Sequence, residues 1–168
     1  MTDPSPMPSL KRRLAAFVYE GVLLFGVAVV TALVFSPLVG QRNAMNDRWG
    51  LMATVGSVFT LYFVYFWSKS GQTLAMQTWR LRVVDLQGQA LTWRRALLRS
   101  LLGWLWFLPA LLLASALSLH GSAIYASVAL GLAVYVLLAW LHPQRRFVHE
   151  ILSRTQVVTK LPTPAKPR

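Results

Sequence analysis

The chain contains no cysteine and only five acidic residues in 168 positions. The absence of cysteine excludes disulfides, thiolate nucleophiles and cysteine-ligated zinc or iron–sulfur centres. Charged residues make up 13% of the sequence, roughly half the share of a soluble domain, whereas 55% of the residues are hydrophobic. This composition excludes a mainly disordered chain and leaves too little polar surface for two soluble domains. The positions of the few charges therefore decide the class of protein.

Three long segments contain no Asp, Glu, Lys or Arg, namely residues 21–41, 49–68 and 100–144. A bilayer core needs roughly 20 helical residues, so each of the first two segments fits one span. The third would make a single helix roughly 67 Å long, so it must fold back at its one polar break, residues 119–122. The sequence thus predicts an all-α membrane protein with four transmembrane helices, at about 14–37, 50–68, 97–119 and 123–141.

The basic residues gather on one side of this predicted bundle. Fourteen of the 17 Lys and Arg residues lie before the first span, between the second and third, or after the fourth. Only Arg42 and Arg48 lie on the opposite side. The positive-inside rule then predicts that both termini and the central loop are cytoplasmic. We attribute the net charge of +12 to this topology and to anionic lipid head groups in the bilayer, rather than to nucleic acid.

The segments outside the predicted spans are short. Residues 1–9 and the Pro-rich basic tail 159–168 are predicted to be disordered, and they flank a transmembrane domain at 10–158. In the central loop, residues 80–84 alternate polar and apolar side chains, a turn-like run follows, and residues 90–92 form a second extended piece. This pattern predicts a small β-hairpin on the cytoplasmic face, between the second and third helices.

Two charged residues fall within the predicted spans. Burying a charge in hydrocarbon costs free energy, so a charged residue there suggests a functional role. Glu20 is either a functional carboxylate or a packing contact with a basic side chain such as Arg99. Arg13 shares nearly the same helix face as Glu20, but the rise of about 10 Å between them is too long for a firm direct pair. Arg99 either snorkels to lipid phosphates or joins a polar cluster.

His149 and Glu150 follow the last predicted span. Adjacent helical residues point about 100° apart and do not chelate one metal ion together, so the spacing favours a solvated cytoplasmic segment. The sequence has no Walker loop, dinucleotide fingerprint, HExxH motif or GxSxG elbow. We therefore expect no enzyme activity, no cofactor and no metal site.

Three short motifs follow one another along the chain. The first joins Arg13 to Glu20 at the start of the first span. The second consists of loop residues and the arginine that opens the third span: Gly71, Gln72, Thr73, Asp85, Gly88 and Arg99. The third is His149 with Glu150, followed by the run at 155–158. In this order the motifs resemble the RDD family of bacterial multi-pass membrane proteins, which is named for one arginine and two aspartates.

The resemblance implies a location in the bacterial inner membrane, and transport is the activity proposed for the family, with sodium/proton exchange suggested for some members. Both signature acids are glutamates here, Glu20 and Glu150, so each carboxylate sits one methylene further out. The loop reads GQTLAM at 71–76, where the family usually has GQTxGK.

Two classes of function remain open. In the first, the chain transports a small ion or solute through a polar cluster at the cytoplasmic side, made of Arg13, Glu20, Arg99, His149 and Glu150. Four helices are few for a complete pathway, so this class implies a homo-oligomer. In the second, the chain is a non-transporting accessory or assembly protein. The cluster then fixes the helices together, and the basic cytoplasmic loop docks a partner or anionic lipid.

Overall fold

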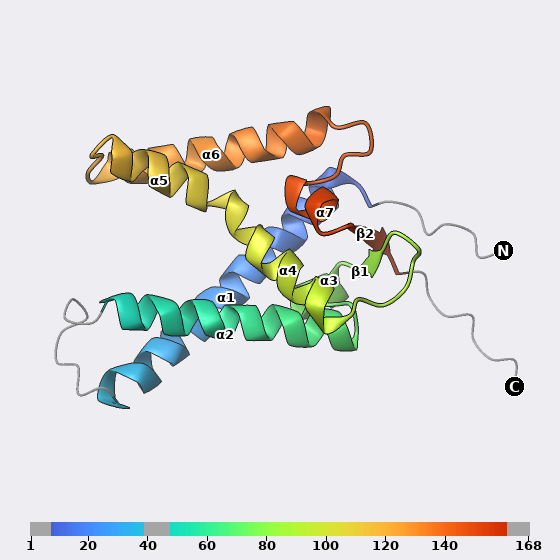
Figure 1. The fold of residues 1–168 in the computed structure, drawn as a ribbon, viewed down its shortest axis with the longest axis horizontal. Coiled ribbons are helices and arrows are strands. Elements are labelled where there is room, and N and C mark those ends of the chain that lie inside the picture. The colour runs from blue at the N-terminus through green and yellow to red at the C-terminus, as the bar shows by residue number, and fades with distance from the viewer. Residues whose placement is uncertain (1–7, 39–47, 161–168) are drawn as a thin grey trace, which may run out of the picture.

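A computed structural model describes residues 8–38 and 48–160 of the chain. These residues form mostly helices, with two short strands (Figure 1). In chain order the elements are α1 (Leu10–Leu38), α2 (Arg48–Lys69), α3 (Leu74–Thr78), β1 (Leu81–Asp85), α4 (Trp93–Gly103), the 3-10 helix η1 (Trp104–Trp106), α5 (Leu108–Ala116), α6 (Ser122–Leu141), α7 (Val148–Leu152) and β2 (Thr155–Thr159).

Three helices, α1, α2 and α6, are each long and apolar enough to cross a membrane. They contain the predicted spans at 14–37, 50–68 and 123–141. Large apolar side chains on α1, such as Val22, Phe25 and Leu33, are more than 60% exposed. Such exposure is costly in water but suits a helix that faces lipid.

The predicted span at 97–119 is not one straight helix. It is broken into α4 with η1, and α5, which meet at an angle of 41°. Phe107 leaves the helical conformation between them, and Pro109 sits in the first turn of α5, where its missing N–H leaves no hydrogen bond unmade. Counted as one bent span, this pair brings the number of candidate spans among residues 8–38 and 48–160 to four.

The polar elements gather at one end of the helices. The start of α1, the end of α2, the start of α4 and the end of α6 all point to the same end, at the right of Figure 1. There they meet α3, β1, α7 and β2, which together we call the polar cap. The turn between α5 and α6 lies at the opposite end.

The cap contains a two-stranded antiparallel sheet, in which Val83 lies opposite Val157. The predicted hairpin is therefore wrong: β1 is as expected, but its partner is β2, near the C-terminus, and residues 90–92 form no strand. The reason is that one edge of β1 is already occupied, since Val83 N–H donates to the Gly71 carbonyl at 2.7 Å. The free edge pairs with β2 instead.

The two predicted disordered segments fall mostly outside the described residues. Pro8 and Ser9 have no regular structure. At the other end, Thr159 still belongs to β2, and the Lys160 N–H donates to the Arg80 carbonyl at 2.8 Å. Backbone pairing with β1 and Arg80 therefore includes the first two residues of the segment predicted to be disordered.

Candidate functional site

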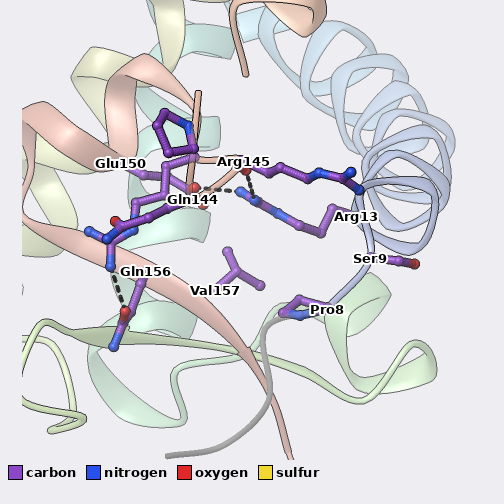
Figure 2. A pocket seen from close by; sticks show the side chains of 10 residues that line it. Pro8, Ser9, Arg13, Gln144, Arg145, Glu150, Gln156 and Val157 are labelled. Atoms are coloured by element: carbon purple, nitrogen blue, oxygen red, sulfur yellow. Dashed lines mark hydrogen bonds and ion pairs between the residues drawn. The ribbon is translucent and has the colours of Figure 1, made fainter. Parts of the chain in front are cut away.

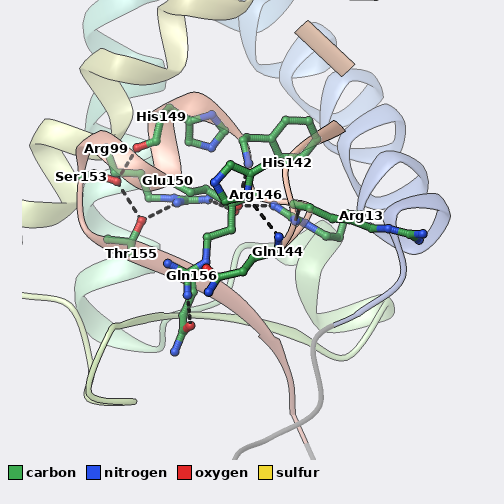
Figure 3. A network of polar contacts seen from close by, with 12 residues as sticks. Arg13, Arg99, His142, Gln144, Arg146, His149, Glu150, Ser153, Thr155 and Gln156 are labelled. Carbon is green, nitrogen blue, oxygen red and sulfur yellow. Dashed lines mark hydrogen bonds and ion pairs between the residues drawn. The ribbon is translucent and has the colours of Figure 1, made fainter. Parts of the chain in front are cut away.

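One buried carboxylate in the polar cap ties three helices together (Figure 3). Glu150 on α7 is 1% exposed. Its Oε2 accepts from Arg13 Nη2 of α1 at 2.5 Å, and its Oε1 accepts from Arg99 Nη2 of α4 at 3.2 Å. The N–H of Phe147 also donates to Oε2 at 3.2 Å. We call Arg13, Arg99 and Glu150, with Thr155, the Glu150 network.

Arg99 lies inside the protein rather than among lipid head groups. It is 3% exposed, its Nη1 donates to Thr155 Oγ1 at 2.5 Å, and its guanidinium lies 5.1 Å from the centre of the Trp67 ring. A buried guanidinium is tolerated only when it is paired and hydrogen-bonded, and the Glu150 carboxylate supplies that pairing. The snorkelling interpretation of Arg99 is therefore wrong.

His149 is also buried, so the prediction of a solvated segment is wrong for both members of this pair. Trp106 Nε1 donates to His149 Nδ1 at 3.2 Å, and the Tyr135 hydroxyl lies 2.9 Å from the same nitrogen. Burial first, and then the charge of Arg99, lower the pKa of His149 to about 3. The imidazole is therefore neutral at physiological pH, held among aromatic side chains.

Glu150 responds to the same surroundings in the opposite way. Burial alone would raise the pKa of its carboxyl, but the charges of Arg13 and Arg99 outweigh that effect and lower the pKa to about 2. The carboxylate is therefore ionised at every physiological pH. Each of its two oxygens is bonded to an arginine, one from α1 and one from α4, which suits it to hold helices together.

Glu20 stands apart from this network. It is 7% exposed on α1, and its two oxygens accept hydrogen bonds from neutral hydroxyls. Tyr62 of α2 donates to Oε1 at 2.7 Å, and Thr73 donates to Oε2. None of the ion pairs in the described part of the chain involves Glu20. The single predicted cluster is thus two sites, and the predicted alternative, a Glu20–Arg99 contact, is wrong.

The Gly71–Gln72–Thr73 motif connects Glu20 to the cap. Gly71 has φ +71°, and a Cβ there would lie 2.8 Å from the Val83 carbonyl oxygen, so only glycine fits without strain. Gln72 Nε2 donates to the Leu81 carbonyl at 2.6 Å. Thr73 caps α3 by accepting from Met76 N–H while it donates to Glu20.

Asp85 and Gly88 build the turn that follows β1. Asp85 Oδ1 accepts from the N–H groups of Gln87 and Gln89, and its Oδ2 accepts from Arg95 at 3.0 Å. Gly88 has φ +78°, a conformation that favours glycine. These two motif residues therefore shape a turn, and they lie apart from both carboxylate sites.

The profile of the RDD family matches residues 7–154, most of the chain. The chain belongs to the RDD family. The predicted resemblance is thereby confirmed, and the matched region contains Arg13, Glu20, the loop motif and Glu150. No curated protein and no solved structure matches the chain. Together with the apolar helices, membership of the family identifies an integral membrane protein.

The RDD motifs do not include several residues that complete the two sites. Tyr62 supplies one of the two donors to Glu20, and Trp106 and Tyr135 form hydrogen bonds with His149. In the sequence, Tyr62 and Tyr135 were distinguished only by placing a hydroxyl group within a segment that has no charged residue. No group of three metal-ligating side chains lies together among residues 8–38 and 48–160 of this RDD chain.

Proposed function

We propose that this RDD protein moves a proton or a small cation across the bacterial inner membrane, and that Glu20 is the carboxylate that carries it. One observation supports the proposal above all. Glu20 is an acid buried in a membrane-spanning helix, and the described residues offer it hydroxyl groups but no cationic partner. An ionised carboxylate in such a place is costly, so a proton or a bound cation compensates its charge.

The side chains around Glu20 suit the binding of a proton or a small cation. The oxygens of Tyr62 and Thr73 lie beside the carboxylate, and hard cations prefer oxygen ligands. Glu150 does not suit the same role, because Arg13 and Arg99 already neutralise it. The earlier hypothesis of one Arg/Glu transport cluster therefore narrows to Glu20, with the Glu150 network as the scaffold that fixes the helices.

The proposed orientation has both termini and the polar cap in the cytoplasm. Exposed arginines at the cap end, among them Arg94, Arg95 and Arg154, support it through the positive-inside rule. We further propose that the transporting unit is a homo-oligomer. Apolar side chains remain exposed along α1 and α6, and three or four helices are few to enclose a pathway.

Reconstitution into liposomes tests the proposal. A proton gradient or a sodium gradient is applied, and flux is followed with an internal pH-sensitive or sodium-sensitive dye. We expect wild-type flux above that of empty liposomes and its loss in Glu20→Gln, which keeps the shape but removes the charge. Asp85→Asn, which removes a carboxylate from the turn after β1, is the matched control and should retain flux. Unchanged flux in a folded Glu20→Gln protein would contradict the proposal.

The second candidate is a non-transporting accessory or assembly protein. It is favoured by the cap, where a sheet and exposed arginines form an organised basic surface. In this case the hydrogen bonds of Glu20 only tie α1 to α2 and to the start of α3. Wild-type liposomes would then show no flux above background, while Glu20→Gln would lower the melting temperature in detergent.

A further inference from the structure

A pocket of about 260 Å³ opens in the polar cap, away from Glu20 (Figure 2). Its wall is formed by the start of α1, the connection from α6 to α7, and β2. The charged residues in its lining are Arg13, Arg145, Arg146 and Glu150. The lining thus contains three arginines and one carboxylate.

The single carboxylate does not neutralise this pocket. Glu150 is already bonded to Arg13, and also to Arg99 behind it. Neither Arg145 nor Arg146 takes part in an ion pair among residues 8–38 and 48–160. Arg146 reaches Gln156 on β2, whereas the Arg145 side chain extends toward the start of α1 (Figure 2). Each therefore brings to the lining a charge that no ion pair among the described residues compensates.

Arg146 also has an unused donor. Its Nη2 donates to Gln156 Oε1 at 2.9 Å, which anchors the side chain on β2. Its Nε is buried and has no hydrogen-bond partner in the described part of the chain. The Nε atoms of Arg82 and Arg99 are buried without a partner in the same way, so what distinguishes this pocket is the positive charge that its one carboxylate leaves uncompensated.

The backbone holds this arrangement in place. Arg145 has φ +49°, in the left-handed region that a non-glycine residue rarely adopts. In that conformation its carbonyl accepts from Arg13 Nη1 at 2.7 Å. Arg13 therefore bridges Glu150 and the Arg145 backbone, and the connection between α6 and α7 is tied to α1 across the back of the pocket (Figure 2).

We propose that this pocket binds a phosphate group. Guanidinium groups match phosphate oxygens in geometry and form strong charge-assisted hydrogen bonds with them. The charge of a phosphate group balances the arginines that Glu150 leaves uncompensated. The pocket lies where α1 begins and α6 ends, so either the head group of an anionic phospholipid or a free phosphate can reach it. The site is separate from Glu20 and does not depend on the proposed transport.

The test uses the purified full chain in a non-ionic detergent and in lipid nanodiscs. In one arm, inorganic phosphate is titrated and binding is measured by calorimetry. In the other, native mass spectrometry counts lipids retained from nanodiscs of phosphatidylcholine with or without phosphatidylglycerol. Arg145→Gln and Arg146→Gln are compared with Arg154→Gln. Arg154 is an ideal control because it is exposed in the same cap, has φ +52° and does not line the pocket.

We expect Arg145→Gln and Arg146→Gln each to weaken binding of the phosphate-bearing probe roughly tenfold, the effect of one charge-assisted hydrogen bond. Arg154→Gln should change it less than about twofold. Binding of phosphatidylglycerol alone identifies a lipid head group, and binding of inorganic phosphate identifies a soluble ligand; either result supports the site. An equal loss in Arg154→Gln, or wild-type protein that binds neither probe, overturns it. If Arg146→Gln lowers the melting temperature, the exposed Arg145 decides the test.

Discussion

Arg13 and Glu150 lie 137 positions apart in the sequence, yet Arg13 Nη2 is 2.5 Å from Glu150 Oε2. The pair joins the start of α1 to α7, and Arg99 adds α4 to the same carboxylate. Because Glu150 is buried and the Arg13 side chain is only 9% exposed, loss of one leaves the other as a largely desolvated charge without a partner. Removing one partner therefore costs more free energy of unfolding than the intact pair contributes, which makes the network sensitive to single substitutions.

Glu150→Gln should be among the most destabilising substitutions in the chain. It leaves Arg13 and Arg99 without a counter-charge, at a cost of about 3 kcal/mol or more. Thermal unfolding in detergent, followed by intrinsic fluorescence, measures the loss. Arg95→Gln is the control, because it removes an exposed member of the Arg95–Asp85 pair and should cost at most about 1 kcal/mol. Equal melting temperatures of the two variants would contradict a supporting role for Glu150.

Acid should weaken the fold in two stages. The pKa of His149 falls from 6.5 to about 3 on folding, so between these values the unfolded chain binds the extra proton, and stability decreases as pH falls. The pKa of Glu150 falls from 4.5 to about 2, so its contribution is complete above pH 4.5 and is lost as pH falls toward 2. Melting temperatures measured from pH 7 to pH 3 should therefore decline first through His149.

His149→Gln separates the two stages. It removes the imidazole, so the decline between pH 6.5 and 4.5 should become shallower, while the decline below pH 4.5 should persist. For the wild type, the slope due to one proton is at most about 1.4 kcal/mol per pH unit. A His149→Gln profile parallel to that of the wild type over the first interval would show that His149 is not the titrating group.

The register of the sheet can be tested in the cysteine-free background. Arg82 lies opposite Val158, and an Arg82→Cys, Val158→Cys double variant should form a disulfide on mild oxidation, seen as a faster band on a non-reducing gel. The Arg82→Cys, Gln156→Cys variant moves one cysteine two residues along β2 and should react poorly, because its Cα atoms exceed disulfide reach. Equal yields would contradict the register, and no cross-link in either variant would contradict the pairing.

The membrane-spanning helices could be predicted from the sequence because long segments without charged residues mark them directly. Residues 123–141, for example, were predicted as a span, and α6 covers Ser122–Leu141. The bend before Pro109 was not predicted, since hydropathy measures how apolar a segment is and carries no information about its direction. The length of an apolar segment therefore predicts how many residues can span the membrane but not where the helix bends.

Pairing between distant residues was harder to predict. Alternation at 80–84 identified β1 correctly, but an alternating pattern does not name its partner, and β2 lies some seventy positions later. The same limit applies to the charges. A contact between Glu20 and a basic side chain such as Arg99 was one of two alternatives for that acid, whereas in the structure Arg99 pairs with Glu150 and Glu20 accepts a hydrogen bond from Tyr62. The resemblance to the RDD family selected the important positions without revealing which of them touch.

The Glu150 network also imposes an order on the assembly of the protein. Arg99 precedes Glu150 by 51 positions, so the arginine is synthesised well before the carboxylate that pairs with it. Until α7 has been made, the four candidate spans that precede it coexist with a guanidinium that lacks its Glu150 partner. We expect the docking of α7 to fix the inserted helices in one arrangement, a step that follows the synthesis of α6 and takes place outside the hydrocarbon.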